Sequence, residues 1–103
     1  MTAQDQTLDL LRRRVERVAE VSALTAKALK LTQALSGIEM DILRIELEIG
    51  RSAPSEQLVQ ELHDTEDSAE TMREAHADCM EEIEAAEAEV AALDQRIVAA
   101  KGG

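Results

Sequence analysis

The feature that most constrains this chain is an apolar repeat between Leu24 and Ile49. Its members follow one another at alternating steps of four and three residues: Leu24, Ala28, Leu31, Leu35, Ile38, Ile42, Ile45 and Ile49. This alternation keeps the side chains on one face of an α-helix, and a seven-residue apolar repeat is typical of a coiled coil. The stretch therefore predicts a long helix that packs an apolar seam against another helix.

A second repeat with the same steps supplies the partner helix. Its members are Leu58, Leu62, Thr65, Ala69, Met72, His76, Cys79, Ile83, Ala86, Val90, Leu93, Ile97 and Ala100. Between the two repeats stand Gly50, which we expect to cap the first helix in the left-handed conformation, and Pro54, which suits a first helical turn. Because the connection is short, the second helix is expected to run back along the first.

Folding the chain at this turn pairs the two repeats residue by residue. From Leu24 to Ile49, the residue numbers of each expected pair add up to 107. Before Leu24, the apolar residues pass through Val18 and Val21 in two consecutive steps of three, which predicts a stammer, a local overwinding of the coiled coil. Beyond the stammer the sum becomes 108, and the expected seam pairs are Val18 with Val90, Val15 with Leu93, Leu11 with Ile97 and Leu8 with Ala100.

The predicted fold class is all-α, an antiparallel two-helix hairpin that forms one coiled-coil domain over residues 1–103. The expected elements are a helix over about residues 6–49, a turn over about 50–54 and a helix over about 55–100. Asp5 or Thr7 is the expected cap of the first helix. The chain has no Trp, Tyr or Phe, and a thin aliphatic core suits two helices better than it suits a thick globular domain.

The first helix also carries a second apolar stripe away from the seam. It consists of Leu29, Met40, Leu43 and Leu47, with Ser36 and Gly37 in the gap. A helix that is apolar on two sides is usually covered on two sides, and small residues let another backbone approach. The alternative is that Gly37 only weakens and bends the helix, at a cost of about 1 kcal/mol. We expect these six residues to form a self-association surface that joins two hairpins into a homodimeric four-helix bundle.

The charge of the chain is −11, and it is unevenly distributed. Residues 56–89 carry thirteen acidic residues and one basic residue, whereas residues 1–35 carry four acidic and six basic residues. Because nucleic acid is an anion, we expect no nucleic-acid partner. A basic group, Arg12, Arg13, Arg14 and Arg17, is expected to pair with Glu87, Glu89 and Asp94 of the second helix. The alternative is that this group docks on an acidic partner.

One cluster has the residue types of a metal site. Met72, His76, Cys79 and Met80 follow one another at helical spacing, and thioether, imidazole and thiolate suit soft ions such as Cu(I). The simpler interpretation is that Met72, His76 and Cys79 fill the seam. His63, Asp67 and Glu70 share another face, which we interpret as a solvated acidic surface. No metal, and no other cofactor, is expected.

The sequence contains no phosphate-binding loop and no catalytic triad, so we expect no enzymatic activity. The favoured function is a protein–protein interaction module, structural, adaptor or chaperone-like, that self-associates and presents an acidic face to a protein partner. Two alternatives stay open: a four-helix bundle that binds Cu or Zn, and a scaffold subunit that depends on a different protein. A single cysteine, the absence of a secretory signal and the absence of a long apolar run favour a soluble, cytoplasmic protein without a membrane partner.

Overall fold

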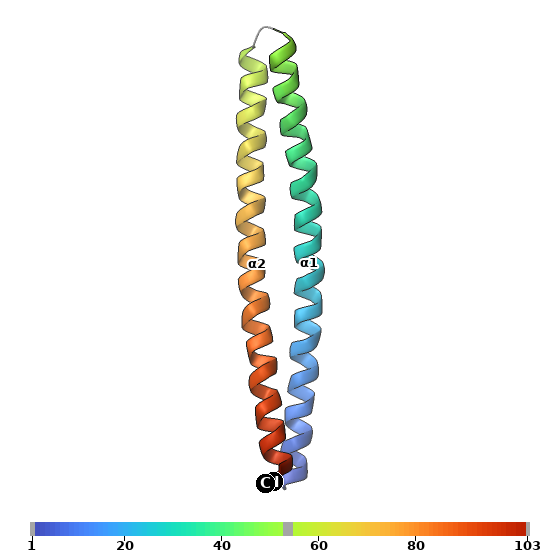
Figure 1. The fold of residues 1–103 in the computed structure, drawn as a ribbon. Helices are drawn as coiled ribbons and strands as arrows, with labels where there is room; N and C mark the ends of the chain where they lie inside the picture. The colour runs from blue at the N-terminus through green and yellow to red at the C-terminus, as the bar shows by residue number, and fades with distance from the viewer. Residues whose placement is uncertain (1, 53–54, 103) are drawn as a thin grey trace. The chain divides into compact units, whose positions relative to one another are not determined.

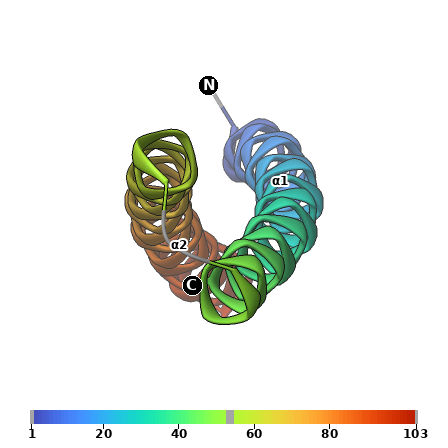
Figure 2. The same cartoon turned by 90° about the horizontal axis from the view of Figure 1, so that it is seen from above.

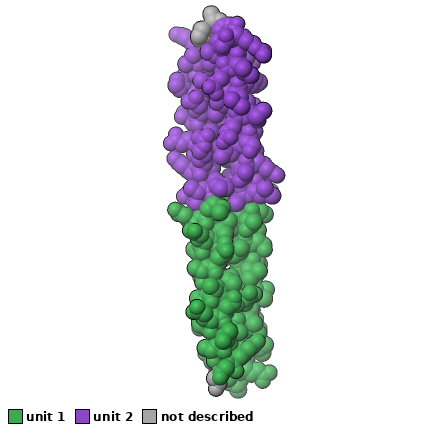
Figure 3. All heavy atoms as spheres, viewed as in Figure 1, with its two compact units in different colours: residues 1–27, 79–103 green, residues 28–78 purple. Residues whose placement is uncertain are grey.

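The computed structural model describes residues 2–52 and 55–102, and these residues form two long helices. Helix α1 spans Ala3–Arg51 and helix α2 spans Glu56–Gly102. The chain divides into two compact units, which are coloured separately in Figure 3: unit 1 comprises residues 1–27 and 79–103, and unit 2 comprises residues 28–78. In each unit a segment of α1 lies beside a segment of α2 (Figure 1, Figure 2).

Contacts between the helices show that they run antiparallel within each unit. In unit 1, Arg14 pairs with Asp94, and the later residue Arg17 pairs with the earlier residue Glu89. In unit 2, Glu39 pairs with Arg73 and Arg44 pairs with Glu61. As residue numbers rise along α1, those of the α2 partners fall. The all-α class and the helical hairpin predicted from the sequence agree with this arrangement.

The seam of unit 2 is the predicted one. Ala28, Ile45 and Ala69 are buried, and the remaining repeat members are half-buried: Leu31, Leu35, Ile38, Ile42, Ile49, Leu58, Leu62, Thr65, Met72 and His76. Ile45 is completely excluded from solvent. Because aliphatic residues recur every three or four positions on both helices, one narrow core forms between them.

The seam of unit 1 differs from the prediction. Leu10 is 3% exposed and packs with Leu93 and Ile97, whereas Leu8 and Val15, which we expected in the seam, are 54% and 66% exposed. Val18 is also exposed, and Leu11 is only partly buried against the cluster. The expected stammer is therefore wrong, together with the pairs Val15–Leu93 and Leu8–Ala100. Of the other two expected pairs, Leu11 packs at the edge of the cluster that contains Ile97, and Val18 lines a surface groove together with Val90.

The register instead continues without interruption. Leu10 and Ile97 have residue numbers that add up to 107, as in the rest of the hairpin. The uninterrupted repeat places Arg14 and Arg17 at the next two seam positions of α1 after Leu10. Both side chains form ion pairs with α2. A long arginine side chain covers apolar surface with its methylene groups while its guanidinium reaches water, so it is tolerated at such a position.

The ends of the helices also differ from the prediction. Thr2 caps α1, because its hydroxyl accepts a hydrogen bond from the amide of Asp5, while the Asp5 carboxylate accepts one from the amide of Thr2. Thr7 instead donates its hydroxyl to the Ala3 carbonyl inside the helix. Asp5 therefore contributes to a reciprocal cap that begins three residues earlier than expected, and Thr7 does not cap the helix.

Gly50 is an ordinary helical residue, so the expected left-handed cap is wrong. No described glycine has a positive φ, and α1 continues past Gly50 to Arg51. Ser52 satisfies the end of the helix, because its amide and its hydroxyl both donate to the carbonyl of Glu48. At the start of α2, Ser55 accepts a hydrogen bond from the amide of Leu58. Pro54, expected in the first turn of that helix, lies outside the described residues.

Candidate functional site

The C-terminal stripe of α1, defined as Leu29, Met40, Leu43 and Leu47, lies on the surface of unit 2. All four side chains are more than half exposed, from 55% at Leu43 to 65% at Met40. Several exposed large apolar side chains along one helix are typical of an interaction site. The sequence predicted this stripe as a binding surface, and the structure leaves it accessible for that role.

Ser36 and Gly37, which we expected to let a second backbone approach, are exposed on the same helix. A methyl group added at Gly37 would meet nothing within 4 Å. The glycine is therefore not required by any packing inside the described chain. Its open surface is compatible with a close approach from another molecule.

The N-terminal stripe of α1, defined as Leu8, Leu11, Val15 and Val18, lies on unit 1. Leu8, Val15 and Val18 are exposed, and Leu11 is half-buried at the edge of the core. Sequence reasoning assigned these residues to the seam and therefore missed them as a surface. The signal that identifies them is the uninterrupted repeat through Leu10, which turns them away from α2.

A shallow groove of about 280 Å³ lies beside the N-terminal stripe in unit 1. It is lined by Val18, Val21, Ser22, Glu87, Val90, Ala91 and Asp94. Its floor is made of small and β-branched aliphatic side chains, and its polar edge comes from two carboxylates of α2. The groove is open to solvent, so it suits the side chain of a docking helix better than an enclosed small molecule.

The basic group of α1 is held by ion pairs within unit 1. Arg14 pairs with Asp94, and Arg17 pairs with both Glu20 and Glu89. The hydrogen bond that Arg17 donates to Glu20 and the negative charge of Glu89 raise the pKa of Arg17. Arg13 also pairs with Asp9 on its own helix. The predicted pairing between the basic group and the C-terminal part of α2 is confirmed for Arg14 and Arg17.

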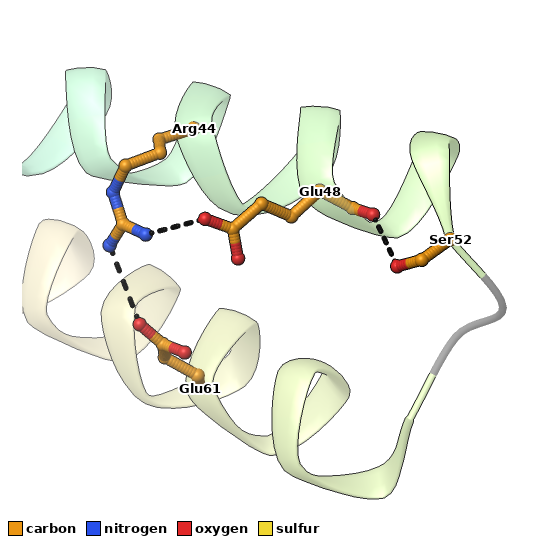
Figure 4. Close-up of polar contacts among 4 residues, drawn as sticks. All are labelled: Arg44, Glu48, Ser52 and Glu61. Carbon is orange, nitrogen blue, oxygen red and sulfur yellow. Dashed lines mark hydrogen bonds and ion pairs between the residues drawn. The ribbon is translucent and has the colours of Figure 1, made fainter.

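An ion network crosses the two helices of unit 2 near the end of α1 (Figure 4). Arg44 donates to Glu48 on its own helix at 3.1 Å and to Glu61 on α2 at 3.4 Å. The hydrogen bonds with Glu61 and Glu48 raise the pKa of Arg44. The backbone carbonyl of Glu48 also accepts a hydrogen bond from the Ser52 hydroxyl, so the network connects the end of α1 with α2.

The α2 segment of unit 2 presents an acidic surface. Residues 56–78 contain eight acidic residues and one basic residue, Arg73, which lies 3.7 Å from Glu39. All eight acidic residues are exposed: Glu56, Glu61, Asp64, Glu66, Asp67, Glu70, Glu74 and Asp78. This acidic face of α2 repels anions and suits a partner with exposed lysine or arginine.

The residues considered for a metal site have different environments. Met72 and His76 are half-buried in unit 2, whereas in unit 1 Cys79 is buried and Met80 is exposed. The Cys79 thiol donates a hydrogen bond to the backbone carbonyl of Leu24, at 3.3 Å. Among the described residues, no three His, Cys, Asp or Glu side chains are grouped so that they could hold a metal ion.

Neither α1 nor α2, over the residues described, contains a segment long and apolar enough to cross a lipid bilayer. Comparison with known protein families, with curated proteins and with solved structures found no match.

Proposed function

We propose that the chain is a non-enzymatic protein–protein interaction module, a coiled-coil hairpin that self-associates and presents the acidic face of α2 to a protein partner. The observation that carries this proposal is the exposure of the C-terminal stripe of α1. Fully burying an exposed leucine or methionine side chain contributes roughly 1.5–3 kcal/mol, and these side chains are still 55–65% exposed, so each can gain more than half of that value. Four such side chains on one helix are therefore a strong driving force for association.

Self-association through α1 is the simplest way to cover the stripe. Two hairpins that pack through α1 form a four-helix bundle, in which each α1 buries a second face. Ser36 and Gly37 lie between Leu29 and Met40 and leave room for the approaching helix. A homodimer is the most common symmetric assembly of this kind.

The acidic face of α2 is proposed to recognise a basic protein surface. Charges at an interface contribute more to the association rate and to partner choice than to affinity. The apolar stripe on α1 and the acidic face on α2 thus have separate roles, assembly and recognition. We propose a cytoplasmic location, which is supported by the single free thiol, Cys79.

The mass of the purified protein in solution tests self-association. Light scattering after size exclusion is expected to give a dimer, and Leu43→Glu is expected to give a monomer that keeps its helical circular dichroism. Ala34→Glu is the matched control, because Ala34 is exposed on the opposite flank of α1, and it should remain dimeric. A fully helical wild-type monomer would refute the self-association.

Neutralising the acidic face tests recognition. Asp67, Glu70 and Glu74 are exposed on outward positions of α2. The triple variant Asp67→Asn, Glu70→Gln, Glu74→Gln is expected to remain a dimer but to lose any larger complex seen in native extract. A larger complex that persists unchanged would show that the acidic face does not bind the partner.

A further inference from the structure

Apart from Leu8, whose mirror position about Leu29 is occupied by Gly50, the two stripes of α1 are mirror images of each other along the helix. Leu11, Val15 and Val18 stand 18, 14 and 11 residues before Leu29, and Leu47, Leu43 and Met40 stand 18, 14 and 11 residues after it. Between them, Ser22 and Ser36 stand seven residues on either side of Leu29, and Thr25 and Gln33 four residues on either side. At these ten positions, each large apolar residue has a large apolar residue at its mirror position, and each small or polar residue has another small or polar residue there.

A mirror pattern of this kind suits a twofold-symmetric antiparallel contact, because every facing layer then pairs residues of similar size and polarity. In such a contact, if residue i of one copy faces residue j of the other, then j also faces i. The steps of three and four within each stripe are the spacing of facing layers in a coiled coil. The pattern therefore singles out a second copy of the same chain as the occupant.

We propose that the N-terminal stripe of one chain docks on the C-terminal stripe of a second copy, with α1 antiparallel to α1 and Leu29 facing Leu29. The facing layers are Leu11 with Leu47, Val15 with Leu43, Val18 with Met40, Ser22 with Ser36 and Thr25 with Gln33. This assembly rests on the self-association proposed above and specifies its geometry. Each chain supplies one stripe of each kind, so two equivalent contacts close the dimer.

The local surface of unit 1 suits this contact. Val18 lines the groove of about 280 Å³, so the second copy's Met40 would place a flexible side chain at its mouth. The Thr25 hydroxyl already donates to the carbonyl of Val21, at 2.7 Å. Its donor therefore remains satisfied when the layer is covered, and the central serine and threonine layers can approach closely.

Charge favours the antiparallel arrangement over the parallel one. Unit 1 contains seven basic and ten acidic residues, a net charge of −3, and unit 2 contains four basic and twelve acidic residues, a net charge of −8. A parallel dimer would bring the two strongly acidic units together. The antiparallel dimer instead places unit 2 of each copy beside unit 1 of the other copy, which carries Arg12, Arg13, Arg14 and Arg17.

Disulfide trapping in a Cys79→Ala background tests the geometry. Two single variants are made, Val15→Cys and Leu43→Cys, and each is oxidised alone and as an equimolar mixture that has been allowed to exchange subunits. A disulfide forms only where two Cα atoms come within roughly 7 Å. We expect a covalent dimer in the mixture and none in either variant alone, with circular dichroism confirming that both remain helical.

A second variant pair tests the same contact without crosslinking. Val15→Glu places a charge in the N-terminal stripe. Like Leu43→Glu, it is expected to halve the mass of the protein in solution. Ala23→Glu, on another exposed face of the same segment of α1, is the control and should leave the dimer intact.

The outcomes separate this inference from the proposed function. Covalent dimers in each single variant alone would indicate a parallel pair, which overturns the inference but keeps self-association. A wild-type dimer that Leu43→Glu dissociates and Val15→Glu leaves unchanged would also overturn the inference alone. A monomeric wild-type mass would overturn both.

Discussion

Replacing Leu10 by alanine tests the register of unit 1. Leu10 is 3% exposed and packs against Leu93 and Ile97. Truncating a buried leucine removes its transfer free energy and leaves a cavity, which together cost 2–5 kcal/mol in typical cores. Because Leu10 lies near the start of α1, where the neighbouring turns can relax, we expect a loss of about 2–3 kcal/mol.

Val15→Ala is the matched comparison, since the stammer would have placed Val15 in the seam. Val15 is 66% exposed, so its truncation removes only about a third of the roughly 1.5 kcal/mol that full burial of a valine contributes. Alanine also has a higher helix propensity than valine, by about 0.5 kcal/mol. The two effects offset each other, and the expected change is close to zero.

Both free energies of unfolding are measured by urea titration with circular dichroism. The variants are built in the Leu43→Glu background, which is expected to keep the hairpin monomeric, so that the measurement reports on the hairpin rather than on the dimer. Similar losses for both variants, or a larger loss for Val15→Ala, would refute the uninterrupted register.

Three further predictions concern a helix cap, the metal alternative and the arginines. Ser55→Ala removes the acceptor for the Leu58 amide and is expected to cost about 1 kcal/mol, whereas Ser55→Asp, which keeps an acceptor, should cost little in the same titration. Adding Cu(I) or Zn²⁺ is expected to leave the melting temperature unchanged, and a saturable stabilisation lost in His76→Ala would revive the metal site. Hydrogen bonds to Glu20 and Glu61 raise the pKa values of Arg17 and Arg44, so the stabilisation that these arginines contribute is fully present below the ordinary arginine pKa and is lost only above it. The difference in melting temperature between wild type and Arg44→Gln should therefore stay constant from neutral pH to about pH 9, and a difference that shrinks over this range would contradict the assignment.

The sequence predicts unit 2 well because only one apolar register is available there. Between Leu24 and Ile49 the seam positions are all aliphatic, and the facing positions from Leu58 to His76 follow the same steps. The exposed stripe through Leu43 was also predictable, because its residues fall between the seam positions of a helix whose register was clear.

The N-terminal segment offers two registers, and hydrophobicity alone selects the wrong one. One register contains Leu8, Val15 and Val18, and the other contains Leu10, Arg14 and Arg17. The structure adopts the second because it preserves the seven-residue repeat without overwinding. Its arginines are compensated by ion pairs with α2, which a search for apolar residues does not weigh.

The helix ends were misassigned for a related reason. Thr2 and Asp5 have the spacing of a capping box, a reciprocal pair that the expectation of a single cap at Asp5 or Thr7 does not include. The sequence interpretation assigns Gly50 the left-handed conformation, which glycine permits but does not require. That cap is not needed, because Ser52 donates to the Glu48 carbonyl. Short polar motifs therefore locate these ends better than single residue types.

The burial of Cys79 makes the chain its own reporter of internal motion. Cys79 is 1% exposed and its thiol is hydrogen-bonded to the Leu24 carbonyl, and the sequence contains no other cysteine. A thiol reagent can react only in molecules where this part of α2 has separated from α1. The rate of labelling then measures how often unit 1 opens, without any added probe.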